Sequence, residues 1–146
     1  MGNCSADPPA SPALVHGDLW PGNVFMTHRE VCLIDWTRGG IDDPALDVGF
    51  AKSSFALMPE PFPPPPPINV LGRLAGRAIA NGISARCDDL VGGANRVRYY
   101  EALRCAVELA DIVAGRTKGE PAGWSHGVSA LVSHLEGMTG LTINFT

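Results

Sequence analysis

The sequence predicts a mainly α-helical protein with a small β-hairpin. Two observations predict this class: two β-type runs lie close together near the N-terminus, and most of the later chain shows the apolar spacing of amphipathic helices. The length of 146 residues suits a single domain. An apolar content of 45% is enough to form a core at this size.

The hairpin is predicted within residues 23–34. Asn23 to Met26 and Val31 to Ile34 are β-type runs, and a short polar stretch, residues 27–30, joins them. Residues 1–13 come before the first motif and are rich in serine, alanine and proline. They are predicted to be a disordered leader, because such a segment has little apolar surface to bury.

Four helices are predicted after the hairpin. The first begins at Asp43, a capping residue followed by Pro44 at the first helical position, and continues to about Leu57. The last ends at Gly140, since glycine commonly terminates helices. The second, third and fourth helices are predicted at residues 68–81, 97–113 and 128–138.

Residues 59–67 contain seven prolines. Proline fixes φ and lacks a backbone N–H, so this stretch is predicted to be an extended linker. It separates residues 14–58 from a helical subdomain at residues 68–146. A ligand for an SH3-type domain is the alternative, but no basic residue flanks the prolines.

Charge and cysteine content narrow the class of protein. The net charge of -4 argues against a nucleic-acid partner. No apolar stretch approaches the roughly 18 residues that a membrane span needs, so no membrane partner is expected. The four cysteines show no CxxC spacing, which favours reduced thiols in a cytoplasmic protein. Cys32 and Cys105 lie in apolar runs and are predicted to be small core residues.

Residues 16–23 and 35 form the most informative pattern, His-x-Asp-x-x-x-x-Asn followed by an aspartate after an apolar run. Phosphoryl transfer needs a carboxylate that faces the acceptor hydroxyl, and oxygen ligands for Mg²⁺. Asp18 is the candidate catalytic base. Asn23 and Asp35 are the candidate Mg²⁺ ligands, and through the metal they would bind the nucleotide. The hairpin between them is predicted to return Asp35 to the loop.

Simpler interpretations stand beside these roles. Asp18 and Asn23 could be turn residues beside glycine and proline. Asp35 is harder to explain in this way, because a charge after an apolar run is costly unless it is solvated, paired or metal-bound. His16 is expected to be a structural hydrogen-bonding residue, since a carboxylate already fills the role of base. Asp47 could be a surface charge on the first helix.

Three segments of the chain together resemble the aminoglycoside phosphotransferase/choline kinase family, which shares the protein-kinase fold. The resemblance is dense from Leu14 to Ala51 and loose afterwards. The segments are His16-Gly17-Asp18-Leu19-Trp20-Pro21-Gly22-Asn23, Leu33-Ile34-Asp35-Trp36 and Asp43-Pro44-Ala45-Leu46-Asp47.

The resemblance implies a role for each motif residue. It implies that Asp18 is the catalytic base, and that Asn23 and Asp35 are Mg²⁺ ligands. It also implies that His16 supports the catalytic loop, and that Asp47 ties the following helix to the loop backbone.

The resemblance covers only one lobe of a kinase fold. The other lobe, which precedes this motif, carries the loop over the phosphates, a strand lysine and its glutamate. Here thirteen residues precede Leu14, and the only lysines, Lys52 and Lys118, follow the motif. We therefore expect residues 14–146 to be the C-terminal lobe of a protein-kinase-like α+β fold, with the N-terminal lobe absent or supplied in trans.

The resemblance implies an enzyme that transfers a phosphoryl group from Mg-ATP, or GTP, to a hydroxyl of a small molecule, here in a truncated or split form. Trp36-Thr37 stands where protein kinases have Phe-Gly, which argues against a protein kinase. A non-catalytic binding or regulatory module is the alternative. A metal-dependent hydrolase is less favoured, because no dinuclear His/Asp set is present.

Overall fold

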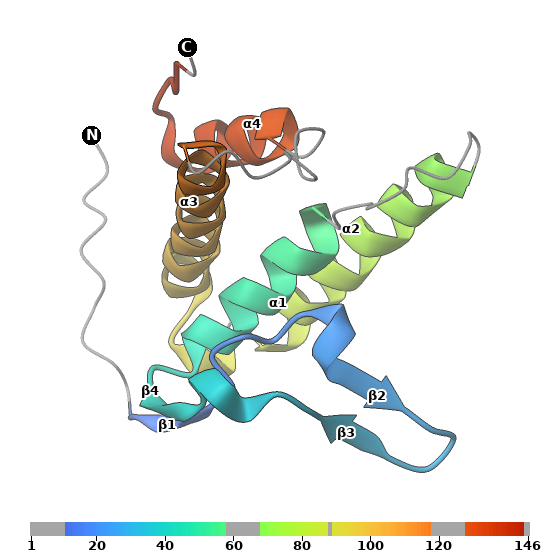
Figure 1. Cartoon of the computed structure of the whole chain (residues 1–146). Coiled ribbons are helices and arrows are strands. Elements are labelled where there is room, and N and C mark those ends of the chain that lie inside the picture. Colours follow the sequence, from blue (N-terminus) through green and yellow to red (C-terminus); the bar gives the residue numbers. More distant parts are fainter. Residues whose placement is uncertain (1–10, 58–67, 88, 118–127, 145–146) are drawn as a thin grey trace.

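The computed structural model describes residues 11–57, 68–87, 89–117 and 128–144 (Figure 1). Within them the fold is mainly α with two small antiparallel sheets, as the sequence predicted for the helical content. The strands are β1 (Ala13–Val15), β2 (Val24–Met26), β3 (Val31–Leu33) and β4 (Gly40–Asp42). The helices are α1 (Ala45–Leu57), α2 (Ile68–Cys87), α3 (Ala94–Thr117) and α4 (Val128–Thr139). Single 3₁₀ turns lie at η1 (Pro21–Asn23), η2 (Trp36–Arg38) and η3 (Asp89–Val91).

The predicted hairpin is confirmed. β2 and β3 pair antiparallel, with Val24 opposite Leu33. The turn is closed by hydrogen bonds in which the Thr27 amide donates to the Glu30 carbonyl at 2.9 Å, and the Glu30 amide donates to Thr27 Oγ1 at 3.0 Å. The prediction that Cys32 is a core residue is wrong, because this side chain lies on the exposed hairpin.

A second sheet was not predicted. β1 pairs antiparallel with β4, with Ala13 opposite Asp42 and Val15 opposite Gly40. Strands of three residues are too short to show an alternating pattern, and this pairing is set by contacts distant in sequence. Ala13, placed at the end of the predicted leader, is thus the first residue of β1. Residues 1–10 of that leader lie outside the described residues.

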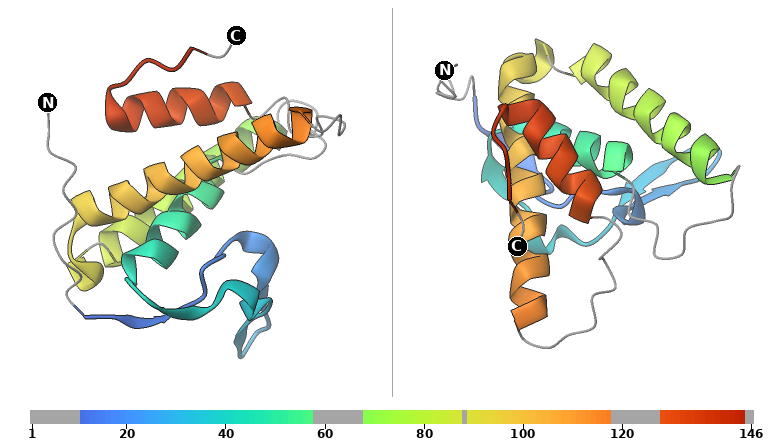
Figure 2. Two further views of the ribbon diagram at one scale, coloured as in Figure 1. Left: turned by 60° about the vertical axis from the view of Figure 1, so that its left-hand side comes forward. Right: turned by 90° about the horizontal axis from the view of Figure 1, so that it is seen from above.

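Helix α1 is the central helix. It packs against both α2 and α3, and α4 packs against α3. Figures 1 and 2 show both sheets on one side of α1, with α4 on the opposite side of the helical layer. Gly49 allows α1 and α3 to approach closely, because a Cβ at this position would lie 2.7 Å from the Glu101 amide nitrogen and 2.9 Å from the Val97 carbonyl oxygen.

The predicted start of the first helix is confirmed. Asp43 Oδ1 accepts a hydrogen bond from the Ala45 amide at 3.0 Å, which is the contact of an N-terminal cap. Asp43 Oδ2 also accepts from Arg96 Nε at 2.5 Å, and both side chains are buried. Burial and the Asp43 charge raise the pKa of the Tyr100 hydroxyl to about 12. The ion pair between Asp43 and Arg96 fixes the start of α3 against the start of α1.

The second helix is longer than predicted. Its predicted end was residue 81, before Gly82, but α2 continues to Cys87. A glycine inside a helix costs about 1 kcal/mol relative to alanine. Residues on both sides of Gly82 are packed, since Ala80 is buried and Ile83 and Ser84 are half-buried. This packing stabilises the helix beyond the glycine. The proline-rich stretch at residues 59–67 lies outside the described residues.

Buried apolar residues lie on α1 (Ala45, Phe50 and Ala51) as well as on β1, α2 and α3, and one cluster of them lies between α3 and α4. The buried residues of this cluster are Cys105, Leu109 and Leu131, and they are surrounded by half-buried apolar side chains, among them Leu57 from the end of α1. Burial raises the pKa of the Cys105 thiol to about 12, so this cysteine is an uncharged core residue at neutral pH, as predicted. No helix among the described residues has the length and apolar character to cross a membrane.

A buried carboxylate ties three helices together. Glu101 of α3 lies 3.1 Å from Lys52 Nζ of α1 and 2.8 Å from His134 Nε2 of α4. Burial alone raises the pKa of Glu101, but the hydrogen bond from His134 and the positive charge of Lys52 outweigh it, so the pKa lies below its ordinary value. The charged form of Glu101 therefore stabilises the helical packing.

Replacing Glu101 by glutamine should make stability less dependent on pH. The pKa of Glu101 is lower in the folded than in the unfolded state. Its contribution to the free energy of unfolding is therefore fully present above the unfolded pKa, about 4.3, and is lost as the pH falls through the folded pKa. Urea unfolding from pH 7 to pH 3 should show a large difference between wild type and Glu101→Gln at pH 7 and a smaller one in acid. Glu30→Gln, in the exposed turn, is the control; a constant difference at every pH would contradict the assignment.

Candidate active site

The His16–Asn23 segment forms a loop between β1 and β2 that runs alongside α1 (Figures 1 and 2). Its end is wound into the turn η1, where the Asn23 amide donates to the Trp20 carbonyl at 2.9 Å. The Trp20 amide donates to the Asp18 carbonyl at 3.1 Å. These local hydrogen bonds bring Asp18 and Asn23 to the same turn.

Asp47 holds the loop against α1. Its Oδ2 accepts a hydrogen bond from the His16 amide at 2.6 Å, and its Oδ1 accepts from the Gly17 amide at 2.8 Å. On the other side of the loop, Gly17 has a φ of +75°, and a Cβ there would collide with the Arg38 carbonyl. A carboxylate that accepts two amide N–H groups makes charge-assisted bonds, which are stronger than neutral ones. The loop is therefore fixed from both sides.

His16 is buried, with 1% of its surface exposed, and both ring nitrogens have partners. Nε2 lies 2.7 Å from the Ile34 carbonyl oxygen, which can only accept, so Nε2 donates. Nδ1 accepts from the Asp18 amide at 3.3 Å. The ring also packs on Trp36, with centroids 4.7 Å apart. His16 thus connects the loop to the end of the hairpin and has no ring nitrogen left for a substrate.

Asn23 is buried and points its amide nitrogen at the loop. Its Nδ2 donates to the Asp18 carbonyl at 3.0 Å, and its backbone carbonyl accepts from the Ile34 amide at 3.0 Å. The side-chain oxygen Oδ1 makes no hydrogen bond to the described residues. It is therefore the atom that could bind a metal ion.

Asp35 follows the hairpin and has a left-handed backbone, with φ 60° and ψ 62°. This conformation costs a non-glycine residue roughly 1–2 kcal/mol, though aspartate tolerates it better than most. Its Oδ1 accepts from Thr37 Oγ1 at 2.7 Å, which leaves Oδ2 without a hydrogen bond among the described residues. No hydrogen bond or ion pair joins its side chain to Asp18 or Asn23; the link between them runs through the backbone of Ile34.

Arg104 is a site residue that the sequence did not predict. Its Nη1 lies 3.2 Å from Asp18 Oδ1, although the two residues are far apart in the chain. Its Nε donates to Glu108 Oε1 at 2.6 Å. From sequence, Arg104 and Glu108 form an ordinary (i, i+4) charge pair on a helix surface. Nothing in that pattern points to the loop.

Asn23 and Asp35 each leave one side-chain oxygen without a hydrogen bond to the described residues. Within the described residues, no group of three or more His, Cys, Asp or Glu side chains is placed to bind a metal. Mg²⁺ does not need such a group, because it is commonly held by one or two protein oxygens together with phosphates and water. Asn23 Oδ1 and Asp35 Oδ2 are oxygen donors of this kind.

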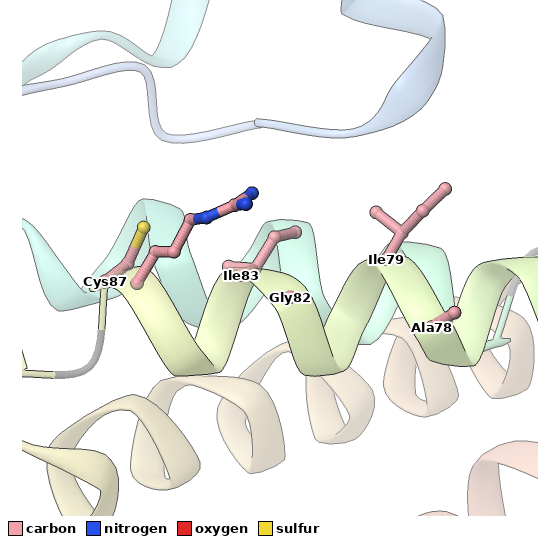
Figure 3. A pocket seen from close by; sticks show the side chains of 6 residues that line it. Ala78, Ile79, Gly82, Ile83 and Cys87 are labelled. Carbon is pink, nitrogen blue, oxygen red and sulfur yellow. The ribbon is translucent and has the colours of Figure 1, made fainter.

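An open groove of about 460 Å³ lies on α2 (Figure 3). Ile79 and Ile83 point to the same side of the helix in this view. The groove is lined by Ala78, Ile79, Gly82, Ile83, Arg86 and Cys87. None of the residues singled out for phosphoryl transfer lines it.

Comparison with known proteins identifies the family. The model of the Phosphotransferase enzyme family, APH, matches residues 2–81, more than half of the chain. The chain belongs to this family. Membership confirms the assignment to the aminoglycoside phosphotransferase/choline kinase family that the motifs suggested, and it indicates a kinase-type enzyme. No curated protein and no solved structure matches the chain.

The segment that matches the family contains the whole loop, the hairpin and α1. Asp18, Asn23, Asp35 and Asp47 all lie within it. Arg104 lies beyond it, on α3. The match to the family therefore covers every site residue predicted from sequence but not the arginine that contacts Asp18.

Removing the Asp47 carboxylate should release the loop of this family member. Asp47→Ala leaves the His16 and Gly17 amides without an acceptor, so the free energy of unfolding should fall by about 1–3 kcal/mol. Hydrogen exchange of peptides containing residues 16 and 17 should become faster. Asp111→Ala, at an exposed position of α3, is the matched control. Equal exchange in wild type and Asp47→Ala would contradict this role.

Proposed function

We propose that this chain is the helical, C-terminal lobe of a kinase-like phosphotransferase. It would transfer the γ-phosphoryl group of Mg-ATP, or GTP, to a hydroxyl of a small molecule. One observation carries the proposal. The Asp18 carboxylate and the Asn23 oxygen lie on one turn, which is hydrogen-bonded internally and held to α1 by Asp47. Phosphoryl transfer depends mainly on such positioning of fixed groups.

In this mechanism Asp18 orients the acceptor hydroxyl and accepts its proton. The hydroxyl oxygen forms a bond to the γ-phosphorus while the bond from that phosphorus to the bridging oxygen breaks, and the nucleoside diphosphate leaves. Asn23 and Asp35 would hold Mg²⁺, which supplies charge neutralisation on the phosphates when bound. Thr37 would support Asp35 through its hydrogen bond to Oδ1.

His16 and Asp47 complete the proposal as supporting residues. Both ring nitrogens of His16 are occupied by the backbone, which supports a structural role and not that of a second base. Asp47 accepts only backbone N–H groups, which supports a role in holding the loop. Neither side chain would touch the substrate.

Two observations favour a second candidate, a non-catalytic or regulatory module that needs a partner lobe. Lys52 is the one lysine among the described residues, and it pairs with the buried Glu101 at 3.1 Å. It is thus not free to bind phosphates. Phe25, Met26 and Val31 are exposed on the hairpin and offer an apolar surface beside the site. A nucleotide-binding lobe supplied in trans would fit both observations.

Two substitutions test catalysis. Asp18→Asn should lower kcat by roughly 10²–10⁴-fold, because the base is lost, and leave Mg-ATP affinity unchanged. Asp35→Asn should weaken Mg-ATP binding by at least about 10-fold, because a metal ligand is lost. Transfer from radiolabelled ATP to water and to a panel of amino alcohols, sugars and aminoglycosides gives kcat, and calorimetry gives affinity.

Asp111→Asn is the matched control and should behave like wild type. If the wild-type chain binds no Mg-ATP and labels no acceptor, catalysis by this chain is contradicted and the second candidate is favoured. If Asp18→Asn keeps wild-type turnover, Asp18 is not the base.

A further inference from the structure

We propose that Arg104 is a positioning residue for the catalytic base, with its guanidinium holding the Asp18 carboxylate in the orientation that accepts the substrate proton. This inference rests on the proposed phosphotransferase function. It is carried by the ion pair between Arg104 Nη1 and Asp18 Oδ1 at 3.2 Å, which joins α3 to the loop. The residue lies outside the segment that matches the family model.

The contact uses only one oxygen of Asp18. No other side chain bonds this carboxylate among the described residues, so Oδ2 stays available to the acceptor hydroxyl. The backbone of Asp18 is held independently, because its amide donates to His16 Nδ1 at 3.3 Å. The contact with His16 therefore fixes the backbone of Asp18, and the ion pair with Arg104 fixes the orientation of its carboxylate. Holding a reacting group in one orientation is a large part of the catalysis of transfer reactions.

Arg104 is itself held firmly. Its Nε donates to Glu108 Oε1 at 2.6 Å, and its guanidinium carbon lies 5.1 Å from the centre of the Phe50 ring of α1. Its side chain is 16% exposed, and that of Asp18 is 23% exposed. An arginine that is stacked on an aromatic ring and bonded to two carboxylates has little freedom, because the planar guanidinium is fixed by each contact. Through Arg104, the orientation of the Asp18 carboxylate is therefore linked to the positions of α3 and α1.

Asp18 and Glu108 together more than neutralise the charge of Arg104. A free guanidinium beside the base would attract phosphate away from the in-line position, whereas Glu108 occupies one side of this cation. A partly buried ion pair of this kind is more constraining than an exposed pair, which contributes little.

The test compares Arg104→Gln with Arg98→Gln. Arg98 lies on the same helix and donates to the Met138 carbonyl at 2.5 Å, without contact to Asp18. Arg104→Gln should lower kcat by about 10- to 100-fold with the KM for Mg-ATP unchanged, because the base is misplaced while the nucleotide site is intact. Arg98→Gln should keep wild-type kcat.

A double-mutant cycle separates positioning from other roles. If Arg104 acts through Asp18, adding Arg104→Gln to Asp18→Asn should cause no further loss of kcat, since the effects of residues that act as a unit are not additive. Guanidinium chloride at low millimolar concentration should restore part of the kcat of Arg104→Ala. Arg104→Lys, which keeps the charge, should show an intermediate kcat, and it replaces Arg104→Gln if thermal unfolding shows that the glutamine variant does not fold.

The outcomes distinguish this inference from the proposed function. Wild-type transfer that is lost in Asp18→Asn but unchanged in Arg104→Gln and Arg104→Lys would overturn the role of Arg104 alone. Additive losses in the double variant would also overturn it. No transfer by the wild-type chain would overturn the proposed function, and this inference with it.

Discussion

The carboxylate of Asp47 is the interaction on which the site depends. It accepts hydrogen bonds from the amides of His16 and Gly17, and so fixes the loop to α1. Once His16 is held, its ring can bond both the Asp18 amide and the Ile34 carbonyl, which joins the loop to the end of the hairpin. One charged group on a helix thus positions the turn and the hairpin, through two backbone amides and the ring of His16. The position of Asp47 in α1 therefore determines where the loop is held.

Helix α1 is itself fixed by contacts to α3. Asp43 caps its start and pairs with Arg96 of α3, while Lys52 in its middle pairs with Glu101. Gly49 lets α3 approach closely between these two pairs. The buried pairs are costly to remove from water, and so each must be completed by its partner to contribute. This arrangement leaves α3 in register with α1 and brings its later residues toward the loop.

Short stretches of sequence were sufficient to predict most secondary-structure elements and the motif. They were not sufficient to predict contacts between residues that are distant in the chain. The hairpin, the cap at Asp43 and the helix stop at Gly140 follow from neighbouring residues, and each was predicted. The β1–β4 pairing and the exposure of Cys32 depend on how the elements pack, which no short window of sequence records. Arg104 is missed for the same reason, because its local pattern is a helical charge pair and its partner Asp18 is distant in the chain.

Arg104 and Lys52 pair with different carboxylates, one on the loop and one on a helix. Asp18 has a cation, Arg104, that orients it from α3, but the lysine of α1 is committed to Glu101 and not to phosphate. In the proposed function the described residues would orient the acceptor and offer two oxygen donors to a metal, and Lys52, the lysine among them, is paired with Glu101. Because phosphoryl transfer requires neutralisation of the phosphates, a metal ion held by Asn23 and Asp35 would have to carry most of that charge in this lobe. The left-handed backbone of Asp35 is consistent with this demand, since strain of this kind persists where a side chain must be presented in one direction.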